Sequence, residues 1–163
     1  MRGRMRGRPR AAGRRAMATV AGMAKMEPGQ WREFVMTGTR TGKLAVTRKD
    51  GRPHVTPVWF VLDGDDIMLT TYGPGIKGRV LRRDPRVSLC VDDQEPPYSF
   101  VVIEGEATIS EDQELLRHWA AVIGGRYMGA DRAAEYGTRN GVPGELLVRI
   151  RPSRVTAEAD IAE

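Results

Sequence analysis

The chain has 163 residues, enough for one domain with a hydrophobic core. Its formal net charge is +5, yet eight of the 26 Lys and Arg residues and none of the 21 Asp and Glu residues lie in residues 1–25, so residues 26–163 hold 18 basic and 21 acidic side chains. This mild acidity argues against a nucleic-acid-binding domain. The single cysteine excludes an internal disulfide. The sequence contains no run of about 18 apolar residues, the length that a membrane-spanning helix needs.

Residues 1–25 are predicted to form a disordered basic arm, because their arginines alternate with Gly, Ala and Pro and cannot contribute to a core. The arm lacks the aromatic side chains that stack on bases, so nucleic-acid binding through it is the less favoured interpretation. It also lacks the apolar segment of a secretory signal, and we expect a cytoplasmic protein without a membrane partner. Residues 26–163 are predicted to form one domain.

The first half of this domain changes from a helical to a strand pattern. "EPGQWREFV" favours a short amphipathic helix with a proline in its first turn. "GKLAVTRKDGRPHVTPVWFVLDGDDIMLTTY" predicts three antiparallel strands, because the Asp-Gly pairs at 50–51 and 63–64 are strong hairpin sequences. The middle strand, residues 53–62, contains Pro57, which cannot donate to a ladder and belongs at an edge or a bulge.

The second half alternates helices and strands. Its pattern predicts a helix over 76–83, a strand over 86–91, a long strand over 98–109, a helix over 112–123 capped by Ser110, a helix over 131–139 and a strand over 145–152. Six or seven antiparallel strands with a few helices indicate a mainly β, α+β domain. The simplest such arrangement is a small antiparallel barrel with helical cover.

The turn between the third predicted strand and the helix at 76–83 has the sequence Gly-Pro-Gly-Ile-Lys-Gly, residues 73–78. It matches the dinucleotide-binding pattern GxGxxG, but the helix has only about two turns and the strands before it are joined by hairpins. A Rossmann site is therefore rejected. The glycines are nevertheless expected to leave backbone N–H groups uncovered at a helix N-terminus, which favours an anion, and Lys77 adds a positive charge. This pattern fits a phosphate-binding turn and a plain loop equally well.

Two further groups of side chains lie near this turn in the sequence. Thr70 and Thr71 offer hydroxyl donors at the strand end. Arg79, Arg82 and Arg83 share one face of the helix, and they either extend an anionic groove or form a solvated face.

Residues 42–93, followed by "YSFVVIEGEATI" and the tail "GRYMGADRAAEYGTRNGVPGELLVRIRPSRV", resemble the pyridoxamine 5′-phosphate oxidase-like split β-barrel superfamily. Within it, the likeness is greatest to the branch that uses the deazaflavin coenzyme F420. The resemblance covers about residues 27–157. It implies an FMN-binding-like split barrel that forms a homodimer, with two cofactor sites at the interface, each built by both chains.

The resemblance also implies the residues of the cofactor site. The flavin or deazaflavin ring is expected to lie along residues 54–58, and strand-end hydroxyls and a helix lysine are expected to hold the phosphate. Trp59, Tyr98, Tyr127 and Met128 are candidates for the pocket wall. The implied cofactor-binding residues are His54, Thr56, Pro57, Val58, Thr70, Thr71, Lys77, Gly78 and Arg79.

The sequence departs from the FMN-using oxidases of this superfamily at the phosphate. Those enzymes carry Ser-Arg-Lys where this chain has Gly75-Ile76-Lys77. The expected function is therefore an F420-dependent oxidoreductase that passes a hydride to a small conjugated acceptor. The alternatives are an FMN-dependent oxidase or reductase, and a protein that binds a flavin or tetrapyrrole without turnover.

Acid–base and metal chemistry find little support in the sequence. No His, Asp and Ser constellation can be assembled, so no catalytic residue is predicted, although His54 is a candidate proton donor. His54 and His118 have no carboxylate at ligand spacing, so no metal site is predicted. A deazaflavin would itself supply the redox chemistry, and the protein would supply orientation.

Overall fold

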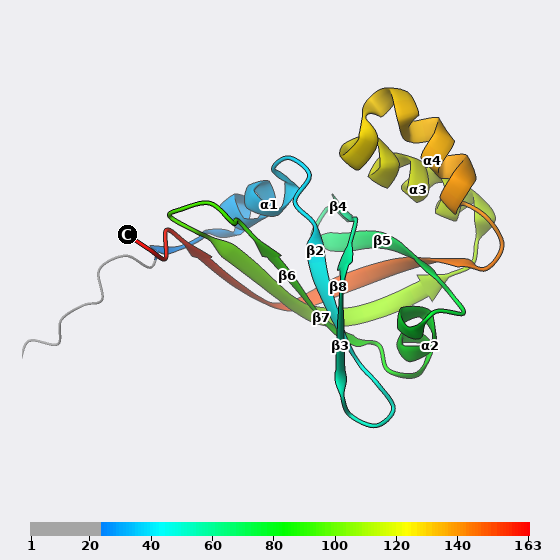
Figure 1. Ribbon diagram of the computed structural model, residues 1–163, viewed down its shortest axis with the longest axis horizontal. Coiled ribbons are helices and arrows are strands. Elements are labelled where there is room, and N and C mark those ends of the chain that lie inside the picture. The colour runs from blue at the N-terminus through cyan, green and yellow to red at the C-terminus, as the bar shows by residue number, and fades with distance from the viewer. Residues whose placement is uncertain (1–23) are drawn as a thin grey trace, which may run out of the picture.

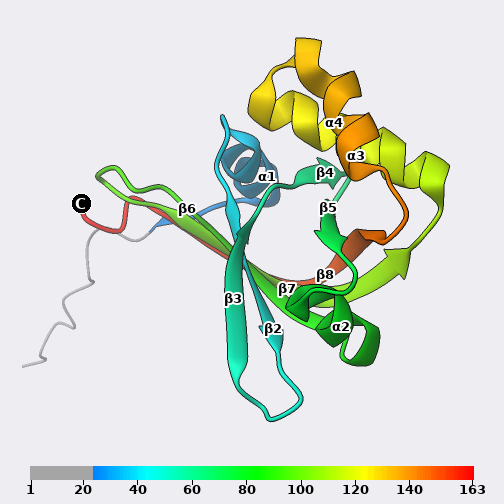
Figure 2. The same ribbon diagram turned by 45° about the vertical axis from the view of Figure 1, so that its right-hand side comes forward.

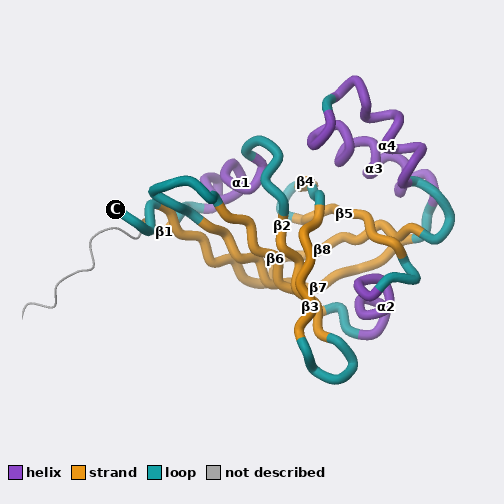
Figure 3. Tube along the Cα trace, in the orientation of Figure 1, coloured by secondary structure: helices purple, strands orange, loops and turns teal. Residues whose placement is uncertain are grey.

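The computed structural model describes residues 24–163, which form eight β-strands, four α-helices and a short 3₁₀ turn (Figures 1 and 3). In chain order they are β1 (Ala24–Lys25), α1 (Pro28–Met36), β2 (Gly42–Thr47), β3 (Pro53–Val58), β4 (Val61–Asp63), β5 (Asp66–Tyr72), α2 (Ile76–Arg83), β6 (Arg86–Asp92), β7 (Phe100–Ser110), α3 (Gln113–Met128), η1 (Ala130–Arg132), α4 (Ala133–Asn140) and β8 (Glu145–Ala159).

All strand pairs in residues 24–163 are antiparallel, in the order β3-β2-β6-β7-β8-β5-β4, with β1 paired to the end of β8. The predicted mainly β, α+β class is confirmed. The sheet curls but does not close, because its two end strands, β3 and β4, do not pair with each other. The strands on either side of α2, β5 and β6, are not neighbours in the sheet, which confirms the rejection of a Rossmann unit.

Two clusters of buried apolar side chains hold the sheet and helices together. The inner cluster lies on the concave face of the sheet and includes Trp31 and Val35 from α1 and Val80 and Leu81 from α2. The outer cluster joins β4, β5 and β8 to α3 through residues such as Met68 and Leu116. Figure 2 shows the result: α2 lies at one end of the curled sheet, α3 and α4 lie over β4 and β5, and the β2–β3 hairpin projects from the body.

The three-strand prediction for residues 42–72 is wrong in its middle strand. Residues 53–62 break at Trp59–Phe60 into β3 and β4, which lie at opposite ends of the strand order. Two side chains of α3 bind the backbone at this break: the Phe60 N–H donates to Tyr127 Oη at 3.3 Å, and Phe60 O accepts from Arg126 Nη1 at 2.7 Å. Since these bonds replace ladder bonds, the chain can leave one edge of the sheet and enter the other.

Arg126 ties the break to α1 as well. Its Nη2 donates to Val35 O at 2.7 Å and its Nε donates to Gly38 O at 3.1 Å, while its guanidinium lies 4.7 Å from the centre of the Phe60 ring. Tyr127 Oη donates to Arg40 O at 2.8 Å. We call Arg126 and Tyr127, with the backbone groups they bind, the α3 clamp.

Most other elements lie close to their predicted bounds. The helix at 76–83 has the predicted limits, and α1 begins with proline as predicted. The predicted Ser110 cap of α3 is wrong, because the Asp112 carboxylate accepts from the N–H groups of Glu114 and Leu115 at 2.9 and 3.0 Å. Residues 24 and 25 of the predicted arm pair with β8, and the rest of the arm lies outside the described residues. No helix in residues 24–163 is long and apolar enough to cross a membrane.

The α3 clamp predicts that Arg126→Met destabilises the fold. The substitution leaves three backbone carbonyls without their charged donor, and we expect the free energy of unfolding to fall by about 3 kcal/mol. Urea denaturation followed by circular dichroism measures this. Arg132→Met is the matched control, because Arg132 pairs with Glu135 on the surface and should contribute less than about 0.5 kcal/mol. Equal losses in the two variants would contradict the role of the clamp.

Candidate functional site

The N-terminus of α2 carries free backbone donors. The N–H groups of Ile76, Lys77 and Gly78 occupy the first three helical positions, and the first intrahelical bond runs from Arg79 N to Gly75 O at 3.1 Å. Gly75 is the cap residue, and no side chain caps the helix. Three N–H groups and the helix dipole therefore favour an anion at this end of α2.

The other two glycines of the turn do not behave as predicted. The Gly73 N–H donates to Gly144 O at 2.8 Å, and the Gly75 N–H donates to Tyr72 O at 3.1 Å. The expectation that these two groups stay uncovered for a ligand is wrong, because the turn uses them to hold its own shape. The anion-binding donors come from the first turn of the helix alone.

Gly78 allows α2 to lie against the end of β5. A Cβ at this position would lie 2.2 Å from Gly73 O and 2.6 Å from Gly73 Cα, both backbone atoms. Gly78 is therefore required for close packing, in addition to its predicted role as a donor through N–H. The sequence pattern alone pointed only to the second role.

Lys77 reaches from α2 to β3. Its Nζ donates to Thr56 Oγ1 at 2.9 Å, so the structure brings together two of the predicted site residues from elements 21 positions apart. Burial lowers the pKa of Lys77 from its usual value. No carboxylate in residues 24–163 lies within ion-pair distance of Lys77, so its charge is not neutralised by the described part of the chain.

The alternation of β3 divides its predicted residues between two faces. His54, Thr56 and Val58 are the less exposed positions, and Val58 belongs to the inner cluster. Pro57 lies on the opposite face with Val55, and both are exposed. Side chains of this strand can therefore meet a ligand on the inner face only through His54, Thr56 and Val58.

The two threonines of β5 also face opposite ways. Thr71 is buried and pairs with Leu146 of the inner cluster, whereas Thr70 pairs with Leu147 of the outer cluster. Only Thr71 shares the inner face with Thr56. Thr70 is placed on the α3 side of the sheet, away from the predicted site.

The three arginines of α2 have separate partners. Arg79 Nη1 donates to Pro74 O at 2.8 Å, Arg82 pairs with Glu111, and Arg83 Nη2 donates to Thr47 O at 2.6 Å. They do not form one continuous basic groove. Arg79 lines a cavity of about 470 Å³ together with Pro74 and Arg82, and neither Lys77 nor Thr56 is among its lining residues.

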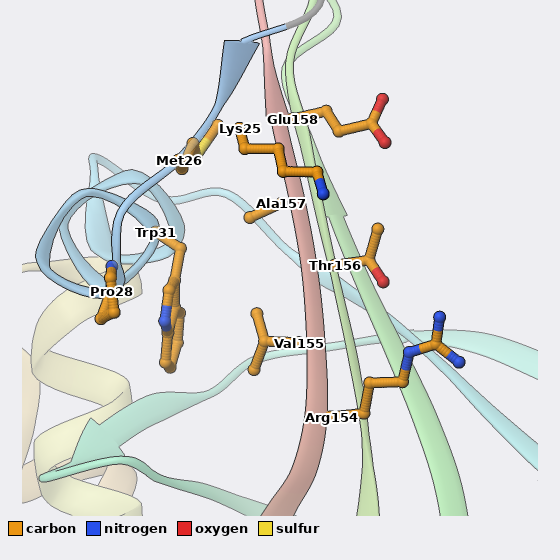
Figure 4. A pocket seen from close by; sticks show the side chains of 9 residues that line it. All are labelled: Lys25, Met26, Pro28, Trp31, Arg154, Val155, Thr156, Ala157 and Glu158. Carbon is orange, nitrogen blue, oxygen red and sulfur yellow. The ribbon is translucent and has the colours of Figure 1, made fainter.

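Figure 4 shows another cavity, of about 430 Å³, between β1, α1 and β8. Val155 and Ala157 point toward Trp31, whereas Thr156 and Glu158 point away from it. None of the nine predicted site residues lines this cavity. We therefore place the candidate site at α2 and β3, where charge and free donors converge, rather than in this cavity.

Two of the expected wall residues are structural. The rings of Trp59 and Tyr127 stack with their centres 5.0 Å apart, and Trp59 also contacts the ring of Tyr136 at 5.7 Å. Tyr98 lies at a turn with φ of +59° and is 41% exposed. No group of three or more His, Cys, Asp or Glu side chains in residues 24–163 is arranged to hold a metal ion.

Residues 28–158 match the family model described as pyridoxamine 5′-phosphate oxidase. The chain belongs to this family. A conserved hypothetical protein from Mycobacterium tuberculosis is 30% identical, with a TM-score of 0.72 over 84% of this chain and 86% of that one. An F420 reductase is 24% identical, with a TM-score of 0.60 over 76% and 94% of the two chains. A FAD-binding protein from Mesorhizobium loti is 23% identical, with a TM-score of 0.61 over 83% and 96%.

Membership in the pyridoxamine 5′-phosphate oxidase family fits the residues present at α2 and β3. A phosphate-bearing cofactor needs free N–H donors and a cation, and the start of α2 supplies both without an opposing carboxylate in the described residues. Sequence analysis did not identify Arg48 as a neighbour of the candidate site. Its Nη2 lies 3.1 Å from His54 Nδ1, a contact that no spacing rule predicted.

The packing of α2 predicts that Gly78→Ala is destabilising. The new Cβ would overlap the Gly73 backbone, and we expect a loss of about 2 kcal/mol in the free energy of unfolding, measured by urea denaturation. Gly29→Ala in α1 is the control, because a Cβ there meets nothing within 4 Å and alanine favours the helix. A Gly78→Ala protein as stable as the control would refute the tight contact.

Proposed function

We propose that this protein is an F420-dependent oxidoreductase, which transfers a hydride from the reduced deazaflavin to a small conjugated organic acceptor. The observation that carries the proposal is Lys77, which projects from the uncapped start of α2 to Thr56 on β3 and meets no carboxylate in the described residues. Family membership supports a flavin-like cofactor in general. The F420 reductase and the FAD-binding protein are relatives of the same fold.

The choice of F420 over FMN rests on the phosphate grip. Gly75 has no side chain, and Ile76, 38% exposed, offers no donor, so Lys77 is the one cation among the first three helical positions of α2. The FMN-using oxidases would place a serine and an arginine at these two positions. This chain therefore binds phosphate with backbone donors and one ammonium group, as we infer for a deazaflavin site.

The roles of the described residues follow from their faces. Lys77 and the N–H groups at the start of α2 would hold the phosphate, and Thr71 lies on the same inner face. The inner face of β3, with His54, Thr56 and Val58, would support the ring. A reduced deazaflavin supplies the hydride when bound, so the protein's task is to hold cofactor and acceptor in reacting geometry and exclude water.

The first test is a fluorescence titration of F420, and separately of FMN, into the full chain and its Lys77→Ala variant. We expect F420 to bind more tightly, and Lys77→Ala to weaken binding by about tenfold or more, because a charged contact to phosphate is lost. Arg82→Ala is the matched control on the same helix, since Arg82 is paired with Glu111. A preference for FMN, or equal affinities in the two variants, would refute the proposal.

The proposal includes a homodimer whose interface contains the outer face of β3. Within residues 24–163 this strand is at the end of the strand order and pairs only with β2. Its outer face exposes Val55, 57% accessible, and Pro57. An apolar edge strand of this kind favours contact with another surface. A second copy would cover the strand on which the ring is expected to lie.

The interface predicts that Val55→Lys separates the protomers. Light scattering coupled to size-exclusion chromatography should give a dimer for the unaltered chain and a monomer for the variant, because a lysine charge would be buried in the contact. Val122→Lys on α3, where the valine is 40% exposed, should leave the dimer intact. A dimeric Val55→Lys protein would exclude this face.

A further inference from the structure

Arg48 stands at the turn of the β2–β3 hairpin, and its backbone is fixed there. Its N–H donates to Arg52 O at 2.9 Å, and its O accepts from the Gly51 N–H at 2.9 Å. Gly51 has φ of +84°, which closes the turn. The guanidinium of Arg48 then reaches His54, the second residue of β3, with Nη2 at 3.1 Å from Nδ1.

This contact assigns the proton of the imidazole. A guanidinium has only donors, so the hydrogen bond requires His54 Nδ1 to be the acceptor. In a neutral imidazole the other nitrogen then carries the hydrogen. His54 is thereby held as the Nε2–H tautomer, with one donor available and no acceptor nitrogen left for a ligand.

The surroundings of His54 are rich in donors and cations. Arg48 Nε is buried and has no hydrogen-bond partner among residues 24–163, which leaves a costly donor beside the imidazole. Thr56 is two residues further along the same face, about 7 Å away at the rise of a strand, with Lys77 bonded to it. Within the described residues neither Arg48 nor Lys77 forms an ion pair, so an acceptor oxygen would complete this face.

We infer that Arg48 is a positioning residue of the candidate site: it fixes His54 as a hydrogen-bond donor through Nε2, directed to a carbonyl or carboxylate oxygen of the ligand on the inner face of β3. His54 then orients the ligand and does not act as a base. The second half of this inference, the bond to the ligand, rests on the proposed function. The first half, the fixed tautomer, does not depend on it.

Nitrogen NMR of the imidazole rings tests the tautomer without any cofactor. The chain has only two histidines, and the signal of His118, exposed on α3, is identified with a His118→Gln variant. At pH 8, where a free imidazole is neutral, we expect His54 to show the Nε2–H form alone. Arg48→Met should give a mixture of tautomers, whereas Arg52→Met, on the same turn and paired with Asp50, should not.

Two results would overturn the positioning role. The first is a proton on His54 Nδ1 in the unaltered chain, a measurement that needs no variant to fold. The second is an Arg48→Met protein, with a thermal unfolding curve like that of Arg52→Met, in which His54 keeps the single Nε2–H form.

A pair of variants at position 54 tests the bond to the ligand, with F420 as the probe. His54→Gln keeps an N–H donor near the place of Nε2, and we expect affinity within about twofold of the unaltered chain. The His54→Met side chain is as long as glutamine but has no hydrogen-bond donor, and we expect it to bind F420 about fivefold more weakly than the unaltered chain. Equal affinity of the methionine and glutamine variants would overturn the donor role. A chain that binds neither F420 nor FMN would overturn the proposed function, while the NMR result would still decide the role of Arg48.

Discussion

The α3 clamp is the contact on which the arrangement of the sheet depends. Arg126 and Tyr127 bind the backbone of Phe60 where an uninterrupted strand would otherwise pair with a neighbour. The chain therefore crosses from one end of the strand order to the other in two residues, and the sheet stays open between β3 and β4. This opening makes β3 an edge strand. The accessibility of β3 at the candidate site thus depends on the guanidinium of Arg126, which is distant in the sequence.

A second constraint fixes the position of α2 relative to β3. Gly78 contacts the Gly73 backbone, and the Gly73 N–H is bound to Gly144 O, so the turn, the helix and the start of β8 form one tightly packed corner. A Cβ at Gly78 would overlap the Gly73 backbone and push the helix away, and a Cβ at Gly73 would lie 2.8 Å from Gly144 O. Lys77, one residue before Gly78, meets Thr56 because this corner is close-packed. The sequence predicted that Gly73 and Gly78 bind a ligand through their N–H groups. In the structure their main role is to position Lys77.

Local patterns predicted the elements, and long-range contacts decided their placement. The Asp-Gly turns, the proline at the start of α1 and the bounds of α2 follow from short-range chemistry, and the structure has all of them. At the break at Trp59–Phe60, the Phe60 carbonyl binds Arg126, which is 66 positions away. Local sequence patterns cannot predict a contact between residues so far apart. The same holds for Lys77 with Thr56. Arg48 and His54 are close in sequence, but only the closed hairpin shows that the guanidinium turns back onto the ring.

The chemical character of the inner face follows from these placements. Arg48, His54 through Nε2, and Lys77 are donors, and Thr56 accepts from Lys77 and keeps its own hydroxyl hydrogen to donate. A face of this kind binds and polarises oxygen atoms of a ligand. It therefore suits the reduction of an electron-poor acceptor, in which negative charge develops on oxygen and needs donors.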